Sequence, residues 1–92
     1  MEDDDYEWDD AKADANYKKH RIRFRQAADV FEDPFVQVEP DLSDDYGEDR
    51  HKATGMAGGR LVTTIFTERG SRIRIISARR ASTDEQRKYH RS

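Results

Sequence analysis

The chain has 92 residues, of which 40% are charged and 34% hydrophobic, and its formal net charge at pH 7 is -3. It contains no cysteine, which excludes disulfides, thiolate metal sites, iron–sulfur clusters and cysteine nucleophiles and favours a reducing compartment. A chain of this length has room for one domain. We therefore expect residues 1–92 to form a single domain, with residues 1–5 as a flexible acidic tail.

Charge is divided unevenly along the chain. Residues 1–49 contain 17 acidic and 6 basic residues, whereas residues 50–92 contain 3 acidic and 11 basic residues. The basic half suits phosphate ligands, or else the two halves neutralise each other. The N-terminus is acidic where a secretory signal is basic, and no segment approaches the ~20 apolar residues of a membrane span. The cytoplasm is therefore the expected location.

The first half of the sequence predicts a short strand, two helices and another short strand. A β-prone stretch at residues 6–8 precedes a helix that Asp9 or Asp10 can cap and that ends near His20. Residues 35–38 are expected to form a strand, and residues 39–49 a polar, acidic loop. Between the first helix and the strand at residues 35–38, a second helix is expected that ends at Asp33-Pro34. Its apolar side chains recur at helical spacing, namely Phe24, Ala27, Ala28 and Phe31.

The second half predicts three strands and a helix. Strands are expected at residues 50–56, 60–67 and 72–79, joined by turns at Gly58-Gly59 and Arg69-Gly70. Ser82, with Glu85 three residues later, forms the capping-box pattern that begins a last helix. Together these elements predict an α+β fold with a largely antiparallel sheet, two N-terminal helices and one C-terminal helix, all packed on one face.

The strand at residues 72–79 carries the first candidates for chemistry. Its alternation points Ile73 and Ile75 to one face, and it points Arg72 and Arg74 to the other. If the isoleucines meet the helices, the arginines stand on the open face. There, guanidinium groups can hold an RNA backbone and stabilise charge that builds on phosphorus. The alternative is that both arginines form salt bridges with the acidic half.

Further candidates lie at the ends of elements. Arg79 lies at the end of the same strand, before the N-terminus of the last helix, which favours anions. Glu68, at a hairpin tip, can act as a base or simply solvate the turn, and His20 can protonate a leaving oxygen or cap its helix. Trp8 and Tyr89 can stack on bases or pack in the core. No metal-ligand spacing, nucleophile elbow or phosphate-binding glycine loop is present, so no cofactor is expected.

Several segments, in order along nearly the whole chain, carry a resemblance to a known family. In these segments the chain resembles the BrnT family of type II toxins. It departs from the family pattern at Arg21, where a glycine is usual, and at Ala53-Thr54-Gly55, where the strand is usually more apolar. The segments are Glu7-Trp8-Asp9, Lys19-His20, Val30-Phe31, Asp33-Pro34, Asp49-Arg50, Gly59-Arg60-Leu61-Val62, Thr67-Glu68-Arg69-Gly70 and Arg72-Ile73-Arg74-Ile75-Ile76-Ser77-Ala78-Arg79.

The resemblance implies a RelE-like fold and a metal-independent ribonuclease that inhibits translation, in which a ribose 2′-OH attacks the neighbouring phosphate. It also implies a toxin–antitoxin hetero-oligomer with a BrnA-type antitoxin, a DNA-binding ribbon-helix-helix protein. Under this hypothesis Arg74 and Arg79 stabilise the transition state, and Glu68 or His20 transfers protons. Four further cations hold RNA phosphates, namely Arg50, Arg69, Arg72 and Lys19.

Two other functions stay open from the residues alone. One is a noncatalytic protein-binding module whose basic sheet face docks an acidic partner. The other is an inhibitor of a DNA enzyme such as gyrase, because folds of this type serve unrelated functions.

Overall fold

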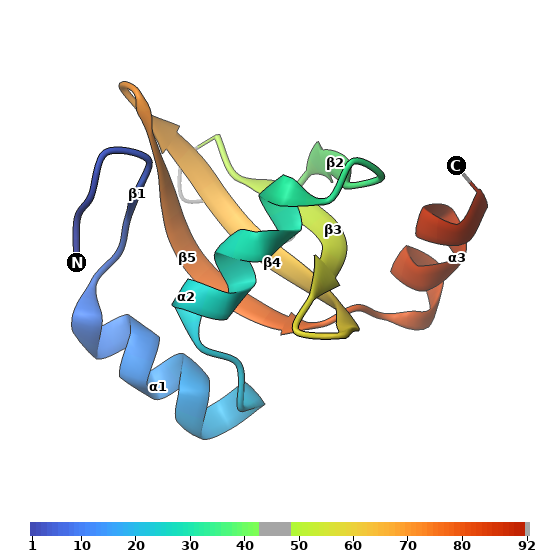
Figure 1. Cartoon of the computed structure of the whole chain (residues 1–92), viewed down its shortest axis with the longest axis horizontal. Helices are drawn as coiled ribbons and strands as arrows, with labels where there is room; N and C mark the ends of the chain where they lie inside the picture. Colours follow the sequence, from blue (N-terminus) through green and yellow to red (C-terminus); the bar gives the residue numbers. More distant parts are fainter. Residues whose placement is uncertain (43–48, 92) are drawn as a thin grey trace.

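The computed structural model describes residues 1–42 and 49–91, so residues 43–48 of the predicted acidic loop lie outside the described part. Its strands form one five-stranded sheet in the order β1-β5-β4-β3-β2 (Figure 1). The predicted α+β class is confirmed. The elements are β1 (Tyr6–Glu7), α1 (Asp10–His20), α2 (Phe24–Ala27), the 3-10 helix η1 (Ala28–Glu32), β2 (Gln37–Pro40), β3 (His51–Ala57), β4 (Arg60–Arg69), β5 (Arg72–Arg80) and α3 (Thr83–Arg91).

The sheet is mixed, so the predicted largely antiparallel pairing is confirmed for three of its four strand pairs and fails for the fourth, which is parallel. Strands β2 to β5 pair antiparallel with one another, but β1 pairs parallel with β5, with Tyr6 opposite Ile73 and Glu7 opposite Arg74. Hairpin connections predict pairing only between strands that follow each other closely in the chain. The β1–β5 pair joins residues far apart in sequence, so local turn signals contain no trace of it.

The hydrophobic core lies between the sheet and the layer formed by α1, α2 and η1. Phe24, predicted as a core residue, is 1% exposed, whereas Phe31 is partly buried against the cluster. The Phe31 ring meets Phe66 of β4 edge-on, with centroids 4.9 Å apart. The Gly55 backbone runs so close to η1 that an added Cβ would lie 3.1 Å from the Val30 carbonyl oxygen. This close approach explains why β3 has a glycine at position 55.

The predicted second helix is divided into α2 and η1. At the junction the Thr64 hydroxyl donates to the Ala27 carbonyl at 3.1 Å, and the Ala28 N–H bonds the carbonyls of Gln26 and Phe24. At the end of η1 the Asp33 N–H donates to the Val30 carbonyl at 3.2 Å, the i to i−3 bond of 3-10 geometry. The sheet therefore interrupts a helix that the apolar spacing predicts as continuous.

Helix α3 lies on the face opposite α1 and α2, which corrects the prediction that all helices share one face. Its Glu85 side chain accepts a hydrogen bond from Thr63 of β4, whereas the next residue, Thr64, bonds α2. Successive strand residues point to opposite faces. The physical reason is that α3 has no apolar stripe to bury in the core, since Glu85 is its one buried residue.

Asn16 of α1 closes the outer edge of β5 beyond β1. Its amide donates to the Ala78 carbonyl at 2.9 Å and accepts from the Ala78 N–H at 3.0 Å. The same amide nitrogen donates to the Ile22 carbonyl at 3.1 Å. One buried side chain thus pairs the strand edge as another strand would, and it holds the end of α1 against the sheet.

Residues 1–5, for which the sequence predicts a flexible tail, contact β1 and its surroundings. The Met1 amino group donates to the Trp8 carbonyl at 2.9 Å. The Asp3 carboxylate accepts from the backbone N–H groups of Asp5 and Tyr6. Together these contacts fold the segment back along the strand (Figure 1).

Arg21 ends α1 in the left-handed conformation, with φ 60° and ψ 30°. Its N–H donates to the Tyr17 carbonyl at 2.8 Å and so caps the helix. Among the described residues it is the one non-glycine with positive φ. A side chain is strained in this region and glycine is not, so the backbone at this position favours glycine.

We predict that Arg21→Gly stabilises the fold. Relief of the strain outweighs the extra chain entropy of glycine, for a net gain of about 0.5–1 kcal/mol and a rise of a few degrees in melting temperature. Arg21→Ala is the control, because it removes the same side chain but keeps the Cβ. Thermal melting should rank Gly above both Arg and Ala, and equal melting of the Gly and Ala variants would contradict the strain.

Candidate active site

The open face of the sheet, opposite the core, carries most of the predicted cations. On β5, Ile75 is 1% exposed in the core, so the alternating Arg72 and Arg74 point to the open face, as predicted. Register places Arg74 opposite Thr67 and Arg79 opposite Thr63. Strands β3 and β4 add polar side chains to this face, namely Lys52, Thr54, Thr63 and Thr67.

A β-bulge brings Arg74 and Arg79 to the same face. Ile65 pairs with Ser77 and the next residue, Phe66, pairs with Ile75, which leaves Ile76 as an extra residue in β5. Residues five apart in a regular strand point to opposite faces, and one inserted residue restores a common face.

Arg74 forms a close ion pair with Glu7 of β1. Its Nη1 donates to the Glu7 carboxylate at 2.7 Å, and the Glu7 side chain is 13% exposed. Arg69 reaches the same carboxylate at 3.9 Å. Arg72 donates to the Asp3 carbonyl at 2.6 Å and lies 3.5 Å from Glu2. The structure therefore confirms the alternative given above for Arg72 and Arg74, which is that both form ion pairs with the acidic N-terminal half.

The β4–β5 hairpin end gathers four of the predicted cations, which are Arg50, Arg69, Arg72 and Arg74. Arg50 directly precedes β3, where the Thr67 hydroxyl donates to the neighbouring Asp49 carbonyl at 2.9 Å. Glu68 is exposed at the same end, but it pairs with Ile73, so alternation points it away from the face that carries Arg74.

Arg79 lies toward the other end of β5 and forms a bidentate ion pair with Glu85 of α3. Its Nη1 and Nη2 donate to the two carboxylate oxygens at 2.8 and 3.0 Å. The Ser82 N–H donates to the Glu85 carboxylate, and the Glu85 N–H donates to the Ser82 hydroxyl oxygen. This reciprocal pair confirms the predicted capping box. Burial opposes ionisation of Glu85, but hydrogen bonds from Arg79, Ser82 and Thr63 outweigh it and hold the pKa of Glu85 far below its ordinary value.

Lys52 of β3 completes this cluster, and sequence patterns do not reveal it. Its Nζ lies 3.2 Å from Glu85 and 3.1 Å from Glu39 of β2. Burial opposes the charged form of Lys52, yet its hydrogen bonds to Glu39 and Glu85 raise its pKa above the ordinary value. Glu85 was predicted only as a capping residue, and its second role depends on contacts with strands distant in sequence.

His20 and Lys19 lie apart from both arginine clusters. With Ile76 and Ser77 they line a cavity of about 320 Å³ between the end of α1 and the edge of β5. The described residues contain no group of three or more side chains suited to hold a metal ion. None of the helices in the described part has the length and apolar character to cross a membrane.

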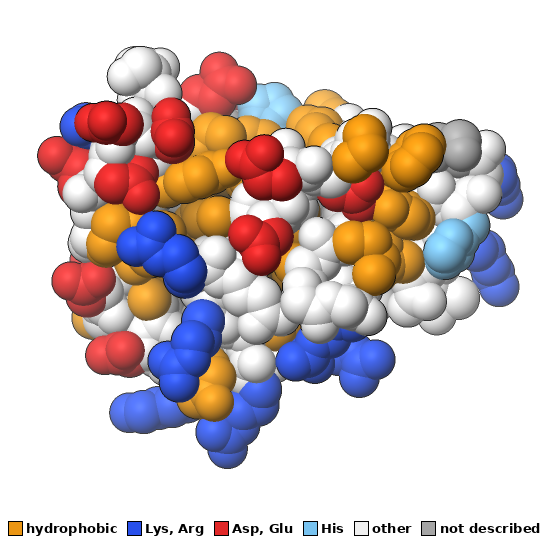
Figure 2. Space-filling model, in the orientation of Figure 1, with side chains coloured by type: hydrophobic (Ala, Val, Ile, Leu, Met, Phe, Trp, Pro, Cys, Tyr) orange, Lys and Arg blue, Asp and Glu red, His pale blue; other side chains and the backbone are white. Residues whose placement is uncertain are grey.

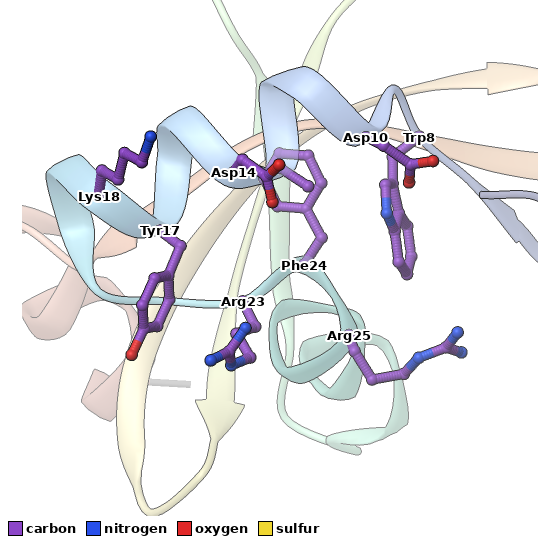
Figure 3. Close-up of a pocket in the computed structure, with 9 residues that line it drawn as sticks. Trp8, Asp10, Asp14, Tyr17, Lys18, Arg23, Phe24 and Arg25 are labelled. Atoms are coloured by element: carbon purple, nitrogen blue, oxygen red, sulfur yellow. The ribbon is translucent and has the colours of Figure 1, made fainter.

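A second cleft, of about 380 Å³, lies between α1 and the start of α2 (Figure 3). Arg23 stacks over Tyr17 there, 4.2 Å from the ring centre. Trp8 is 8% exposed and packs edge-on against Phe24, which confirms the core alternative for this tryptophan. The cleft contains none of the predicted site residues. Basic side chains gather over the C-terminal end of α1 on this side, with acidic ones over the N-terminal segment and the start of α1 (Figure 2).

Comparison with known proteins identifies one family. A family model described as "Ribonuclease toxin, BrnT, of type II toxin-antitoxin system" matches residues 8–85. The match includes every predicted site residue and ends at the buried carboxylate of Glu85. A search of curated proteins found no match.

We predict that Glu85→Gln lowers the free energy of unfolding near neutral pH by about 2 kcal/mol, because the amide removes the carboxylate that Arg79 binds at two points and leaves Lys52 with Glu39 alone. The pKa of Glu85 is lowered by folding, so its contribution is complete above the ordinary value of 4.5 and is lost as pH falls below it. The difference from wild type should therefore shrink in acid. Asp84→Asn, one residue away and exposed, should give no such pH-dependent difference in denaturant titrations.

Proposed function

The chain belongs to the BrnT family of ribonuclease toxins of type II toxin–antitoxin systems, and we propose that it cleaves RNA on the open face of its sheet without a metal ion. The observation that carries the proposal is the bulge in β5, which gives Arg72, Arg74 and Arg79 one common face. Guanidinium groups match phosphate oxygens in geometry and charge. A row of them along a strand fits a phosphodiester backbone.

The proposed reaction is an internal transfer at phosphorus. A base takes the proton of a ribose 2′-OH, the 2′ oxygen bonds to the adjacent phosphorus, and the bond from phosphorus to the 5′ oxygen breaks. An acid protonates that leaving oxygen, which leaves a cyclic phosphate and a free 5′-OH. Since negative charge builds on the phosphoryl oxygens, fixed cations provide the main stabilisation.

We propose Arg74 and Arg79 as the stabilising cations. They are five residues apart on β5, or about 15 Å along a strand, so one holds the reacting phosphate and the other a neighbouring one. Arg50, Arg69, Arg72 and Lys19 contact further phosphates. Of the two proton-transfer candidates, Glu68 and His20, we favour His20, which lines a cavity with Ser77 at the edge of β5, because Glu68 points away from the face that carries Arg74.

In the cell we propose that this cleavage inhibits translation in the cytoplasm until a BrnA-type antitoxin of the ribbon-helix-helix class binds the toxin. Family membership supports both a toxin and an antitoxin partner. It also favours a ribonuclease over the alternatives of a noncatalytic binding module and a gyrase inhibitor.

The first test is cleavage of labelled RNA in the presence of EDTA. We expect activity in wild type and a loss of about a hundredfold to a thousandfold in Arg74→Ala and in Arg79→Ala, the usual effect of removing one preorganised charge. Arg80→Ala is the matched control, because its exposed side chain is adjacent on the same strand but alternates to the other face.

Stability must be followed in the same experiment, since Arg79→Ala also leaves the buried Glu85 with fewer partners. Arg79→Lys keeps a positive charge beside Glu85 but not the planar two-point contact with phosphate. It should therefore melt closer to wild type while remaining poorly active. Full activity of both alanine variants, or activity that EDTA abolishes in wild type, would refute the proposal.

The second test is expression without a partner. We expect growth arrest with reduced incorporation of labelled amino acids, and rescue when a ribbon-helix-helix antitoxin is co-expressed and purifies with the chain. Arg74→Ala should be tolerated by the cells and should still bind the antitoxin. Normal growth on soluble wild-type protein would contradict the toxin assignment.

A further inference from the structure

We infer that Glu85 occupies a binding site for an RNA phosphate, and that α3 is a removable cover on that site. The inference rests on the proposed function, since it names a phosphate-binding site on the same open face. It adds Lys52 and Thr63 to Arg79, and we call these three sheet residues the phosphate cradle. It also makes Glu85 a competitor of the substrate.

The phosphate cradle surrounds a carboxylate with donors. Arg79 donates to both Glu85 oxygens at 2.8 and 3.0 Å, the Thr63 hydroxyl donates at 2.9 Å, and Lys52 lies 3.2 Å away. The Glu85 side chain is 6% exposed. Like a carboxylate, a phosphodiester presents two anionic oxygens, and a guanidinium fork binds either group with two parallel hydrogen bonds.

The cradle belongs to the sheet and does not depend on α3 for its position. Lys52, Thr63 and Arg79 lie on the neighbouring strands β3, β4 and β5. Thr63 uses its proton on Glu85, so the Thr54 hydroxyl, 2.8 Å away, donates to Thr63. Backbone pairing on both sides of β4 keeps the donors together when the helix moves.

Helix α3, by contrast, is held by polar contacts and buries no apolar side chain. Besides Glu85, Lys88 bonds Glu39 at 3.0 Å and the Tyr89 hydroxyl donates to Asp33 at 2.6 Å. Most helices of globular proteins dock by burying an apolar stripe, and in α3 Glu85 is the one buried residue. Water can replace each of these contacts, and an anion can replace Glu85. The helix also stands at the end of the molecule, away from α1 and α2 (Figure 1).

With Glu85 in the cradle, a phosphate cannot bind there, because two anions would share one set of donors. RNA must therefore displace α3, and the free energy of that displacement weakens the measured affinity. Removing the Glu85 charge should abolish the competition and leave the donors in place.

The test compares Glu85→Gln with Asp84→Asn, which changes the same charge one residue away on a side chain that is 83% exposed. The probe is a labelled single-stranded oligodeoxynucleotide, which has the phosphodiester but lacks the attacking 2′-OH. We expect Glu85→Gln to bind it about tenfold or more tightly than wild type, as loss of a competing state predicts. Asp84→Asn should bind like wild type.

Hydrogen exchange of the α3 amides supplies a readout that a purely structural role of Glu85 would not produce. In wild type, α3 should lose protection when the oligodeoxynucleotide binds, and in Glu85→Gln it should be unprotected from the start. If α3 stays protected in the complex, or if folded Glu85→Gln binds no better than wild type, Glu85 only positions Arg79 and the inference is wrong.

If Glu85→Gln does not fold, the double variant Lys88→Met with Tyr89→Phe loosens α3 without touching the cradle, and it should also bind the probe more tightly. Unchanged binding with an exposed α3 would overturn the inference.

Cleavage of the matching RNA in EDTA separates the failure of this inference from the failure of the proposed function. If the RNA is cleaved in an Arg79-dependent way while the α3 amides stay protected from exchange, the role of α3 as a cover is wrong and the ribonuclease mechanism stands. If Glu85→Gln or the double variant binds the probe more tightly but no variant cleaves RNA, the ribonuclease mechanism is wrong and the inference about α3 stands.

Discussion

One extra residue in β5 decides which side chains share the open face of the sheet. Before Ile76 the alternation sends Arg72 and Arg74 outward, and the bulge lets Arg79 follow them. In a regular strand Arg79 would point to the core side, where Ala78 is fully buried, and a buried guanidinium would need a partner there. The bulge therefore fixes both the packing of β5 and the row of cations on which the proposed chemistry depends.

The unequal charge of the two halves of the chain is resolved by specific pairs. Glu7 neutralises Arg74 at 2.7 Å, and Glu39 neutralises both Lys52 and Lys88. Exposed pairs of this kind stabilise a fold little, but half-buried ones fix long side chains in one geometry. The cations of the open face are thus already oriented, and a phosphate must compete with carboxylates that the chain itself supplies.

Local patterns predicted the parts of this fold that depend on neighbours in sequence. Gly58 and Gly59 both have positive φ, as a tight hairpin requires, and the capping box at Ser82 begins α3 as expected. The parallel β1–β5 pair, the side on which α3 docks and the bulge at Ile76 depend on residues far apart in the chain. The same holds for the site, because Glu7, Lys52 and Glu85 become functional candidates only through their distant partners.

The two arginines of the open face differ in how easily their partners can leave. Glu7 belongs to β1, whose backbone pairs with β5 at Arg74 itself, so its carboxylate can leave Arg74 only by a side-chain rotation or by opening the sheet edge. Glu85 belongs to a helix with no buried apolar side chain, and the helix can move as a unit. The Arg74–Glu7 and Arg79–Glu85 ion pairs therefore differ in how easily a phosphate can replace the carboxylate. At the hairpin end a phosphate can take Arg74 only after the Glu7 side chain rotates away, with Arg69 and Arg72 beside it, whereas at Arg79 the whole donor set becomes available once the helix leaves.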